Sequence, residues 1–236
     1  MQTQLYFWKP VVERHKTELS TVADYYAKTK VYFNDIDGEA KKYRSKLYSE
    51  YRGNEDTDYS AVSEWAEEES VELYQALLTM KSNHLLMTIS LLYHTWEQQL
   101  IKFTIRELAH YFEFKERVMQ FNEVKKIFKL HKVSIDETDS WKMIRELKLL
   151  TNTIKHGDGE SAKKLRKIRP EIFESSFGGY SSDLLELNGA VLLDGYTLKV
   201  TENDLIEYII ATKGFWDEMP ERAFSDTDSI IKEFES

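Results

Sequence analysis

Residues 60–112 contain neither glycine nor proline, and this uninterrupted run restricts the fold more than any other feature of the sequence. Glycine and proline are the residues that most readily end a helix, so a run without them favours long helices. The run is either one helix or two helices that meet near Ser82 and Asn83. Its middle part, residues 85–96 (LLMTISLLYHTW), is apolar on nearly every side. A helix of this kind is expected at the centre of a hydrophobic core.

The rest of the chain also favours helices. Only 9 glycines and 3 prolines occur among 236 residues, and no internal repeat or change of composition marks a domain boundary. We therefore expect a single, mainly α domain over residues 1–236. A small β-hairpin is expected near the C-terminus, because two apolar runs flank Asp194 and Gly195, a pair typical of a two-residue turn. Residues 177–180 (FGGY) are expected to form a loop. We expect four parts in chain order: N-terminal helices, a helical core, the hairpin and C-terminal helices (residues 1–52, 60–169, 188–200 and 201–236).

Several classes of protein are disfavoured by what the sequence lacks. There is no cysteine, which excludes disulfides and thiolate metal sites and fits a reducing compartment. The N-terminus has no basic region followed by an apolar run, and the longest apolar patch, residues 85–93, is far shorter than the ~20 residues that span a bilayer. The histidines do not converge at helical spacing, and no phosphate-binding glycine loop occurs. We therefore expect a cytoplasmic protein with no membrane segment, no metal and no cofactor.

Charge is distributed unevenly along the chain. There are 32 Lys and Arg residues against 41 Asp and Glu residues, a net charge of −9, which argues against a general affinity for nucleic acid. Residues 142–169, however, hold nine basic and three acidic residues, a net of +6, so the remainder carries −15. Such a segment suits a phosphate-binding surface. It equally suits docking on an acidic part of the same protein or of a partner.

Residues 143–156 predict a helix with two unlike faces. At about 100° per residue, one side is apolar and holds Met143, Leu147, Leu150 and Ile154. The opposite side, within about 120°, holds a polar stripe of Arg145, Lys148, Asn152, Lys155 and His156. Gly157 is a suitable residue to end the helix. Leu149 lies among the charged residues, so we expect a second subunit to cover this face in a homodimer.

The end of this helix resembles the motif of the HEPN superfamily (higher eukaryotes and prokaryotes nucleotide-binding domains). That motif consists of arginine, a polar residue that is often asparagine, three further residues and histidine. Asn152, the three-residue gap and His156 match it, whereas Thr151 stands in place of the arginine. The wider sequence, KLLTNTIKHGDGESAKKLRKIRPEIF, is similar to a bacterial subgroup whose motif helix ends in lysine, histidine and glycine. Glu97, in YHTWEQQL, resembles an acidic position on an early helix of such domains.

The resemblance covers residues 60–169 and implies a HEPN-like helical bundle with extra N-terminal helices. It also implies RNA binding and metal-independent RNA cleavage at a dimer interface, in bacterial phage defence or a toxin–antitoxin system. In such an endoribonuclease an imidazole acts as general base or acid at the ribose hydroxyl and the leaving oxygen.

The resemblance and the polar stripe together assign roles to particular residues. His156, Asn152 and Lys155 are expected to be catalytic, and Glu97 is expected to orient the site. Contacts with RNA phosphates are expected from four cations, Arg145, Lys148, Arg166 and Arg169. Because Thr151 replaces the arginine, two alternatives stay open. One is a non-catalytic protein-interaction or scaffold module, and the other is a module that binds nucleotides without cleaving RNA.

Overall fold

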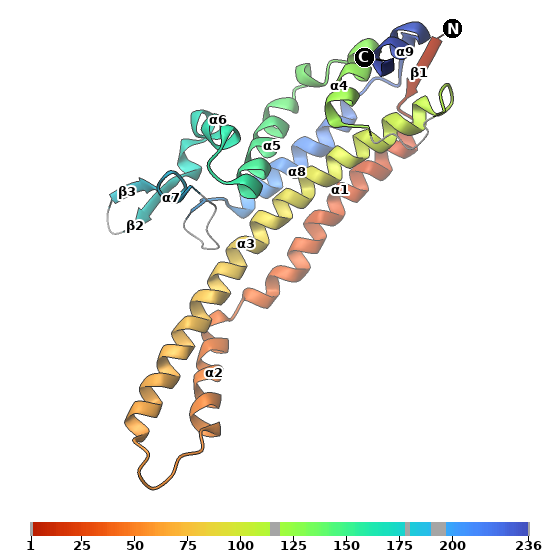
Figure 1. Ribbon diagram of the computed structural model, residues 1–236. Helices are drawn as coiled ribbons and strands as arrows, with labels where there is room; N and C mark the ends of the chain where they lie inside the picture. Colours follow the sequence, from red (N-terminus) through yellow and green to blue (C-terminus); the bar gives the residue numbers. More distant parts are fainter. Residues whose placement is uncertain (1, 114–118, 178–179, 190–196, 236) are drawn as a thin grey trace.

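The computed structural model describes residues 2–113, 119–177, 180–189 and 197–235, and it shows a mainly α protein (Figure 1). The α-helices in chain order are α1 (Lys9–Thr29), α2 (Ile36–Glu50), α3 (Tyr59–Leu108), α4 (Phe121–Leu130), α5 (Trp141–His156), α6 (Glu160–Ile168), α7 (Leu184–Asn188), α8 (Glu202–Asp217) and α9 (Thr227–Glu235). The short 3₁₀ helices are η1 (Lys30–Phe33), η2 (Ile135–Glu137) and η3 (Pro170–Ile172). The strands are β1 (Gln2–Tyr6), β2 (Glu174–Phe177), β3 (Tyr180–Asp183) and β4 (Arg222–Asp226).

Helix α3 runs through most of the length of the molecule (Figure 1). It contains 50 residues, which corresponds to a length of about 75 Å. Its start is fixed by Asp58, whose side chain accepts hydrogen bonds from the backbone N–H groups of Ser60 (2.9 Å) and Ala61 (3.4 Å). The run without glycine or proline is therefore one helix, not two. In the part of the chain that the structure describes, no helix is both long and apolar enough to cross a membrane.

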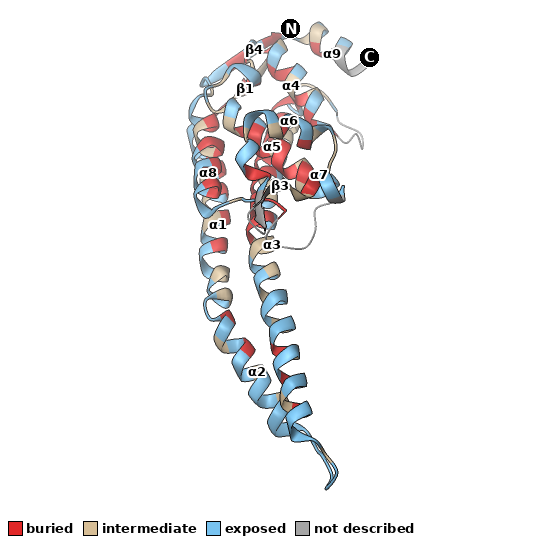
Figure 2. Ribbon diagram, turned by 90° about the vertical axis from the view of Figure 1, so that its left-hand side faces the viewer, coloured by how far each residue is buried: buried red, intermediate tan, exposed pale blue. Residues whose placement is uncertain are grey.

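The N-terminal half of α3 pairs with α2 in a helical hairpin that projects from the rest of the molecule (Figures 1 and 2). We call this hairpin, α2 together with residues 59–82 of α3, the arm. Its buried residues are few and mostly small: Ile36, Ala40, Val62, Ala66 and Ser70. The rest of the arm is largely exposed, as the pale blue ribbon in Figure 2 shows. The arm is therefore held by a narrow seam of contacts.

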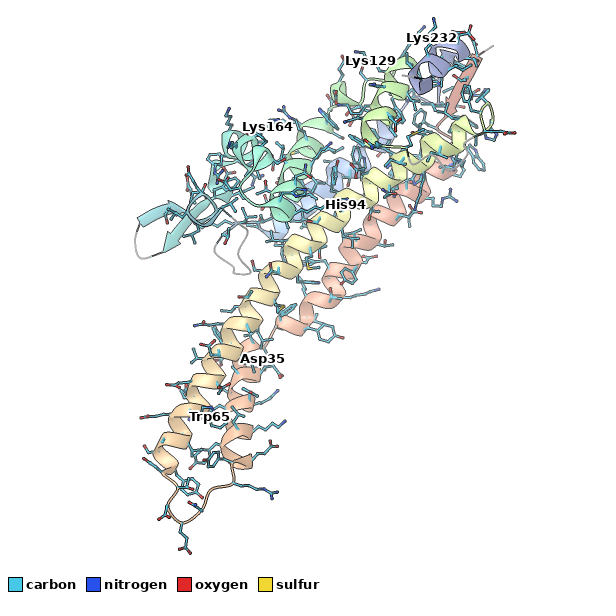
Figure 3. All side chains as sticks on the ribbon, in the orientation of Figure 1. Asp35, Trp65, His94, Lys129, Lys164 and Lys232 are labelled. Atoms are coloured by element: carbon cyan, nitrogen blue, oxygen red, sulfur yellow. The ribbon has the colours of Figure 1, made fainter. Side chains whose placement is uncertain are left out.

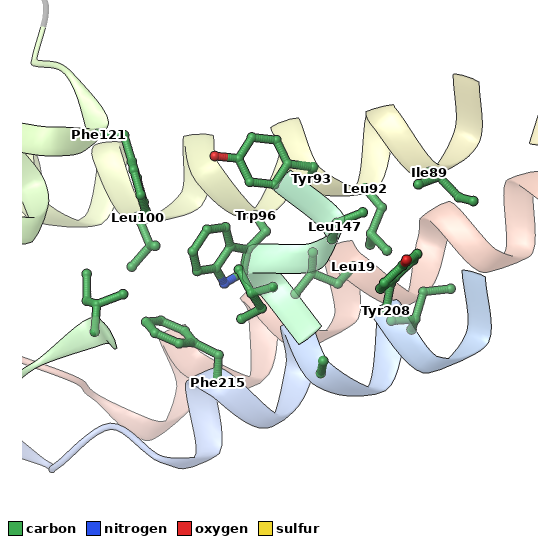
Figure 4. Packing of buried hydrophobic residues seen from close by; sticks show 14 of the residues in the cluster. Leu19, Ile89, Leu92, Tyr93, Trp96, Leu100, Phe121, Leu147, Tyr208 and Phe215 are labelled. Carbon is green, nitrogen blue, oxygen red and sulfur yellow. The ribbon is translucent and has the colours of Figure 1, made fainter. Parts of the chain in front are cut away.

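The C-terminal half of α3 lies at the centre of the body of the protein, against α1, α5 and α8. Large aromatic side chains fill this core, and each of them is less than 2% exposed: Trp96, Phe103, Phe128, Tyr208, Phe215 and Trp216. The rings of Trp96 and Phe215 meet edge to face, with centroids 5.2 Å apart (Figure 4). Residues 85–96 are central, as expected, but Met87 and Leu91 face solvent and are 69% and 46% exposed.

The structure describes two small sheets within its placed residues, and the first joins the two ends of the chain. Strand β1 pairs antiparallel with β4, with Gln2 opposite Asp226 and Tyr6 opposite Arg222. Neither strand was expected, because the sequence analysis assigned only helices to residues 1–52 and 201–236. The partners are far apart in the sequence, and no connecting turn provides the local signal by which a hairpin is recognised. Helix α9 follows β4, so helices do make up the rest of the C-terminal segment.

The second sheet is a hairpin of β2 and β3, with Glu174 opposite Asp183 and Phe177 opposite Tyr180. Phe177 and Tyr180, expected in a loop, are therefore paired strand residues, and residues 178 and 179 between them lie outside the described residues. The turn expected at Asp194 and Gly195 lies outside the described residues. The described end of that predicted hairpin, residues 197–200, forms no strand. Its backbone instead contacts η3, where the N–H of Lys199 donates to the carbonyl of Ile172 (2.7 Å).

Candidate functional site

Helix α5 carries the sequence motif, and contacts fix both of its ends. At the N-terminus, the Glu218 carboxylate accepts hydrogen bonds from the backbone N–H groups of Asp139 (2.6 Å) and Ser140 (3.0 Å). A carboxylate is favoured there because helix N-termini expose unpaired N–H groups. At the C-terminus, Gly157 adopts φ 72° and ψ −145°, and its N–H donates to the carbonyl of Thr153 (2.9 Å). Glycine tolerates a positive φ far better than other residues, so the prediction that Gly157 ends the helix is confirmed.

The rest of the protein covers most of the circumference of α5. Helix α5 packs against α3, α6 and α8. Its buried residues, which spread over about 220° of the helical wheel, are Ile144, Glu146, Leu147, Leu149, Leu150, Thr151 and Thr153. The remaining arc is about 140° wide, and the predicted polar residues span about 100° of it: Arg145, Lys148, Asn152, Lys155 and His156. We call these five residues the α5 stripe. Three of them, Arg145, Lys155 and His156, are exposed, and the other two are partly exposed.

Leu149 does not lie on an open face. It is 9% exposed and belongs to the hydrophobic core of its own chain. The argument that a second subunit must cover Leu149 is therefore wrong, because the body of the same chain already does so. A homodimer remains a prediction without this support.

His156 is the last residue of α5, and its imidazole is exposed. Among the described residues, nothing forms a hydrogen bond or an ion pair with this ring. Lys155, its neighbour, is also exposed. Both side chains lie at the C-terminal end of the helix, where the partial negative charge of the backbone stabilises cations. The end of α5 therefore presents an imidazole and an ammonium group side by side to solvent.

Thr151 and Asn152, the two motif positions about one turn before His156, point in different directions. Asn152 belongs to the α5 stripe and is partly exposed, about 6 Å along the helix axis from His156. Thr151, which occupies the place of the arginine in the HEPN motif, is 2% exposed. Its hydroxyl oxygen has no hydrogen-bond partner among the described residues. The chain therefore supplies no cation from position 151 to the solvent-facing surface.

Glu97 and Lys148 lie close to each other, on α3 and α5. The Tyr93 hydroxyl donates a hydrogen bond to Glu97 (2.7 Å), whose second carboxylate oxygen lies 3.7 Å from Nδ1 of His94. Lys148 packs its ammonium 4.7 Å from the ring centroid of Phe121. Burial lowers the pKa of Lys148, and the nearby charge of Glu97 opposes this shift. His156 lies about 12 Å further along α5 than Lys148, so Glu97 does not orient His156 within one chain.

Arg166 is engaged with its own chain. It forms ion pairs with Asp158 and Asp183, both at 2.5 Å, and lies 4.7 Å from the ring centroid of Phe173. Burial raises the pKa of Asp183, but the hydrogen bond and charge of Arg166 and the backbone hydrogen bonds of Glu186 and Leu185 together outweigh burial, and the pKa is below its ordinary value. Arg166 therefore ties α6 to the start of α7.

Arg169 is the centre of an ionic network that includes two buried carboxylates, those of Glu146 and Asp204. Its guanidinium contacts the carboxylates of Glu146, Glu171 and Asp204. Glu146 also accepts a hydrogen bond from the hydroxyl of Tyr208 (2.7 Å), and both residues are buried. The expectation that Arg166 and Arg169 bind phosphates is wrong for this conformation, since both guanidinium groups are held in ion pairs within the chain and the unpaired Nη2 of Arg166 is buried. The sequence does contain a signal for this network, because the helical wheel places acidic Glu146 on the buried side of α5.

The groups of the α5 stripe suit the binding of an anion. They do not by themselves make a complete set of catalytic groups. Arg145 and Lys155 are unpaired among the described residues, and His156 adds an exposed imidazole. Within the described ranges, no three His, Asp or Glu side chains gather in a way that would hold a metal ion. Comparison with known proteins finds no family model, no curated protein and no solved structure that matches this chain.

Proposed function

We propose that this protein is a HEPN-like RNA-binding protein and that the α5 stripe contacts the RNA. One observation carries the proposal. The protein covers every side of α5 beyond its first turn except the stripe that holds Arg145, Asn152, Lys155 and His156. Phosphate groups are bound by cations and amides that are free of internal partners. Because the rest of the chain is strongly acidic, contact with RNA would be confined to this surface.

RNA cleavage is the narrower form of the proposal. His156 would remove the proton of a ribose 2′-hydroxyl or protonate the leaving oxygen. Lys155 would stabilise the charge of the transition state, and Asn152 would orient the phosphate. Neither Arg166 nor Arg169 is free to assist, and Thr151 is buried. Cleavage therefore requires that a second copy of the chain completes the site, as expected for a HEPN-like dimer.

Binding is tested by fluorescence anisotropy with labelled single-stranded RNA over a range of salt concentrations. Replacing both Arg145 and Lys155 with alanine should weaken binding. It should also reduce the slope of log K against log salt by about 1.4, since each phosphate contact contributes about 0.7 for single strands. The matched control replaces Lys28 and Lys46, which are exposed on α1 and α2, and should leave the slope unchanged. Equal losses in the two double variants would refute a specific role of the stripe.

Cleavage is tested with structured and single-stranded RNA in the absence of divalent metal. The wild-type protein should cleave, and His156→Ala should not, although both should unfold at the same temperature. Cleavage of equal rate by both proteins would show a contaminating nuclease and refute the catalytic role. RNA binding without cleavage would leave the broader proposal intact and refute the narrower one.

A second candidate function, a protein-interaction scaffold, is favoured by the arm. The part of α3 that belongs to the arm exposes large side chains, among them Trp65 (40%), Val71 (45%) and Tyr74 (38%). Such residues on a projecting hairpin are typical of a surface that binds another protein. The two functions are distinguished by the RNA measurement, because a scaffold that acts only through the arm binds no RNA at the α5 stripe.

A further inference from the structure

A groove lies between α1 and α3 on the body of the protein. Its volume is about 550 Å³, and its walls come from Arg14, His15 and Glu18 on α1 and from residues 91–106 of α3. His94, labelled in Figure 3, lines the groove on α3. On the helical wheel of α3, the groove residues centre about 150° away from Glu97, which faces α5. The groove is therefore a different surface from the α5 stripe.

Cations gather at one end of this groove. Arg14 and Lys102 are exposed, and neither has an ion pair among the described residues. Arg106 donates from Nε and Nη2 to Glu107 (3.1 Å and 2.8 Å), which leaves its Nη1 for another acceptor. Three cations from two helices thus border one concave surface. Unpaired cations in a concave site attract an anionic group more strongly than cations on an open surface.

His15 lies beside these cations, and its ring has no hydrogen-bond partner in the part of the chain that the structure describes. It is 7% exposed, and its ring stacks on Trp216 with centroids 4.5 Å apart. Neither ring nitrogen forms a hydrogen bond among the described residues, and the nearest carboxylate oxygen, on Glu18, lies 3.5 Å from Nδ1. A buried polar group without a partner is costly, so this ring is suited to gain one from a ligand. Burial lowers the pKa of His15, which keeps one N–H donor and one acceptor nitrogen at neutral pH.

The other groups of the groove define what else a ligand would meet. Gln99 is fully engaged: its amide nitrogen donates to the His15 carbonyl (3.0 Å) and to Glu18 (2.9 Å), and its oxygen accepts from Trp216 (3.1 Å). Glu18 is the acidic residue of the lining, and its charge opposes an anion. At the other end, the exposed side chain of Leu91 gives the groove an apolar wall. One end is therefore cationic and the other apolar.

We propose that the groove between α1 and α3 binds a small organic anion, with its phosphate or carboxylate group near Arg14, Lys102 and His15 and its apolar part directed along the groove toward Leu91. Ligand sites in proteins commonly have this size and combine an apolar wall with a few polar groups that fix orientation. The anionic group would receive hydrogen bonds from Arg14 and Lys102 and satisfy the ring of His15. This inference is independent of RNA binding, because no residue of the α5 stripe lines the groove.

The proposal is tested with the full-length protein and three probes: phenyl phosphate, benzoate and benzyl alcohol. Binding is measured by calorimetry and by the nuclear magnetic resonance signal of the His15 ring. Phenyl phosphate or benzoate should bind saturably at a single site and shift the His15 signal, and the stronger of the two identifies the anionic group. Benzyl alcohol has the apolar part without the charge and should bind at least about tenfold more weakly. Equal binding of all three probes would overturn the proposal.

Variants locate the site and give effects of opposite sign. Replacing both Arg14 and Lys102 with glutamine should weaken binding by about tenfold or more, whereas Glu18→Gln should strengthen it by about threefold. The matched control replaces Lys28 and Lys46 with glutamine, which removes the same charge elsewhere and should change affinity by less than about twofold. All of these side chains are exposed, so thermal unfolding should confirm that each variant is folded. Absence of saturable binding in the wild-type protein, or equal weakening in the control, would refute the assignment.

Discussion

Replacing Arg169 with methionine should destabilise the protein severely, because it leaves two buried carboxylates without their cation. The side chains of Glu146 and Asp204 are only 6% and 8% exposed, and that of Arg169 is 21% exposed. Methionine keeps much of the length of arginine, so the effect reports the lost charge more than a cavity. Removing one partner of a buried ion pair costs about 3–5 kcal/mol. For a chain of this size, such a loss lowers the melting temperature by about 10 °C.

The measurement is urea unfolding at pH 7, followed by circular dichroism, with the slope of the transition checked for constancy. Arg145→Met, which removes an exposed cation of α5, is the matched control and should cost less than about 0.5 kcal/mol. A cost below about 1 kcal/mol for Arg169→Met would refute the view that this network is shielded from solvent.

The same network gives a pH dependence with a definite sign. Burial raises the pKa of Asp204, but hydrogen bonds from Thr201 and Arg169 outweigh it, and the folded-state pKa lies below its ordinary value of 3.8. A carboxyl with a lowered folded-state pKa stabilises the protein above its unfolded-state pKa. That stability is lost as the pH falls through the folded-state pKa. In Arg169→Met, protonation relieves the unpaired carboxyl of Asp204, so the difference in unfolding free energy between variant and wild type should narrow from pH 7 to pH 4. A gap that widens would contradict this account.

Three further predictions concern other parts of the fold. Gly157→Ala should cost about 1–3 kcal/mol in thermal unfolding, because a side chain at φ 72° and ψ −145° is strained; an unchanged melting temperature would show that the helix end rearranges freely. Burial lowers the folded-state pKa of His131 below 6.5. The contribution of the neutral His131 ring to folding stability is therefore complete above pH 6.5, and it is lost as the pH falls through the folded-state pKa. His131→Gln should flatten the fall of stability in mild acid, and an equal slope would assign that fall to other groups. Ala66→Glu places a charge at a site that is 1% exposed in the arm. Hydrogen exchange should then accelerate in α2 and not in α8, and acceleration in both would show that arm and body unfold together.

Local signals predicted the helices of this protein well. The run without glycine or proline became α3, and Gly157 ends α5 with the positive φ that its residue type allows. Thr201 caps α8 as its residue type suggests, with its hydroxyl and N–H bonded to Asp204. Each of these features depends on residues within a few positions of one another, so one stretch of sequence contains the information.

Contacts between distant residues were not predictable in the same way. The pairing of β1 with β4 joins the two ends of the chain, and Arg169 meets Asp204 across 35 positions. Beside the groove between α1 and α3, the Gln99 side chain donates a hydrogen bond to the carbonyl of His15, which lies 84 positions earlier. Charge along the sequence therefore predicts a free basic surface near the motif, although Arg166 and Arg169 have partners elsewhere in the chain. The α5 stripe was predictable because helical periodicity alone sets which residues share a face.

The continuity of α3 has a mechanical consequence. Helices bend sharply at glycine or proline, and α3 contains neither, so it bends only by small elastic changes spread along its length. The part of α3 in the arm is about 36 Å long, and a tilt of about 10° at its base would move the tip by about 6 Å. Helix α3 then continues beneath α5, where its residues Tyr93 and Trp96 pack in the core. A load at the tip of the arm is thus delivered, as through a lever, to the helix on which α5 rests.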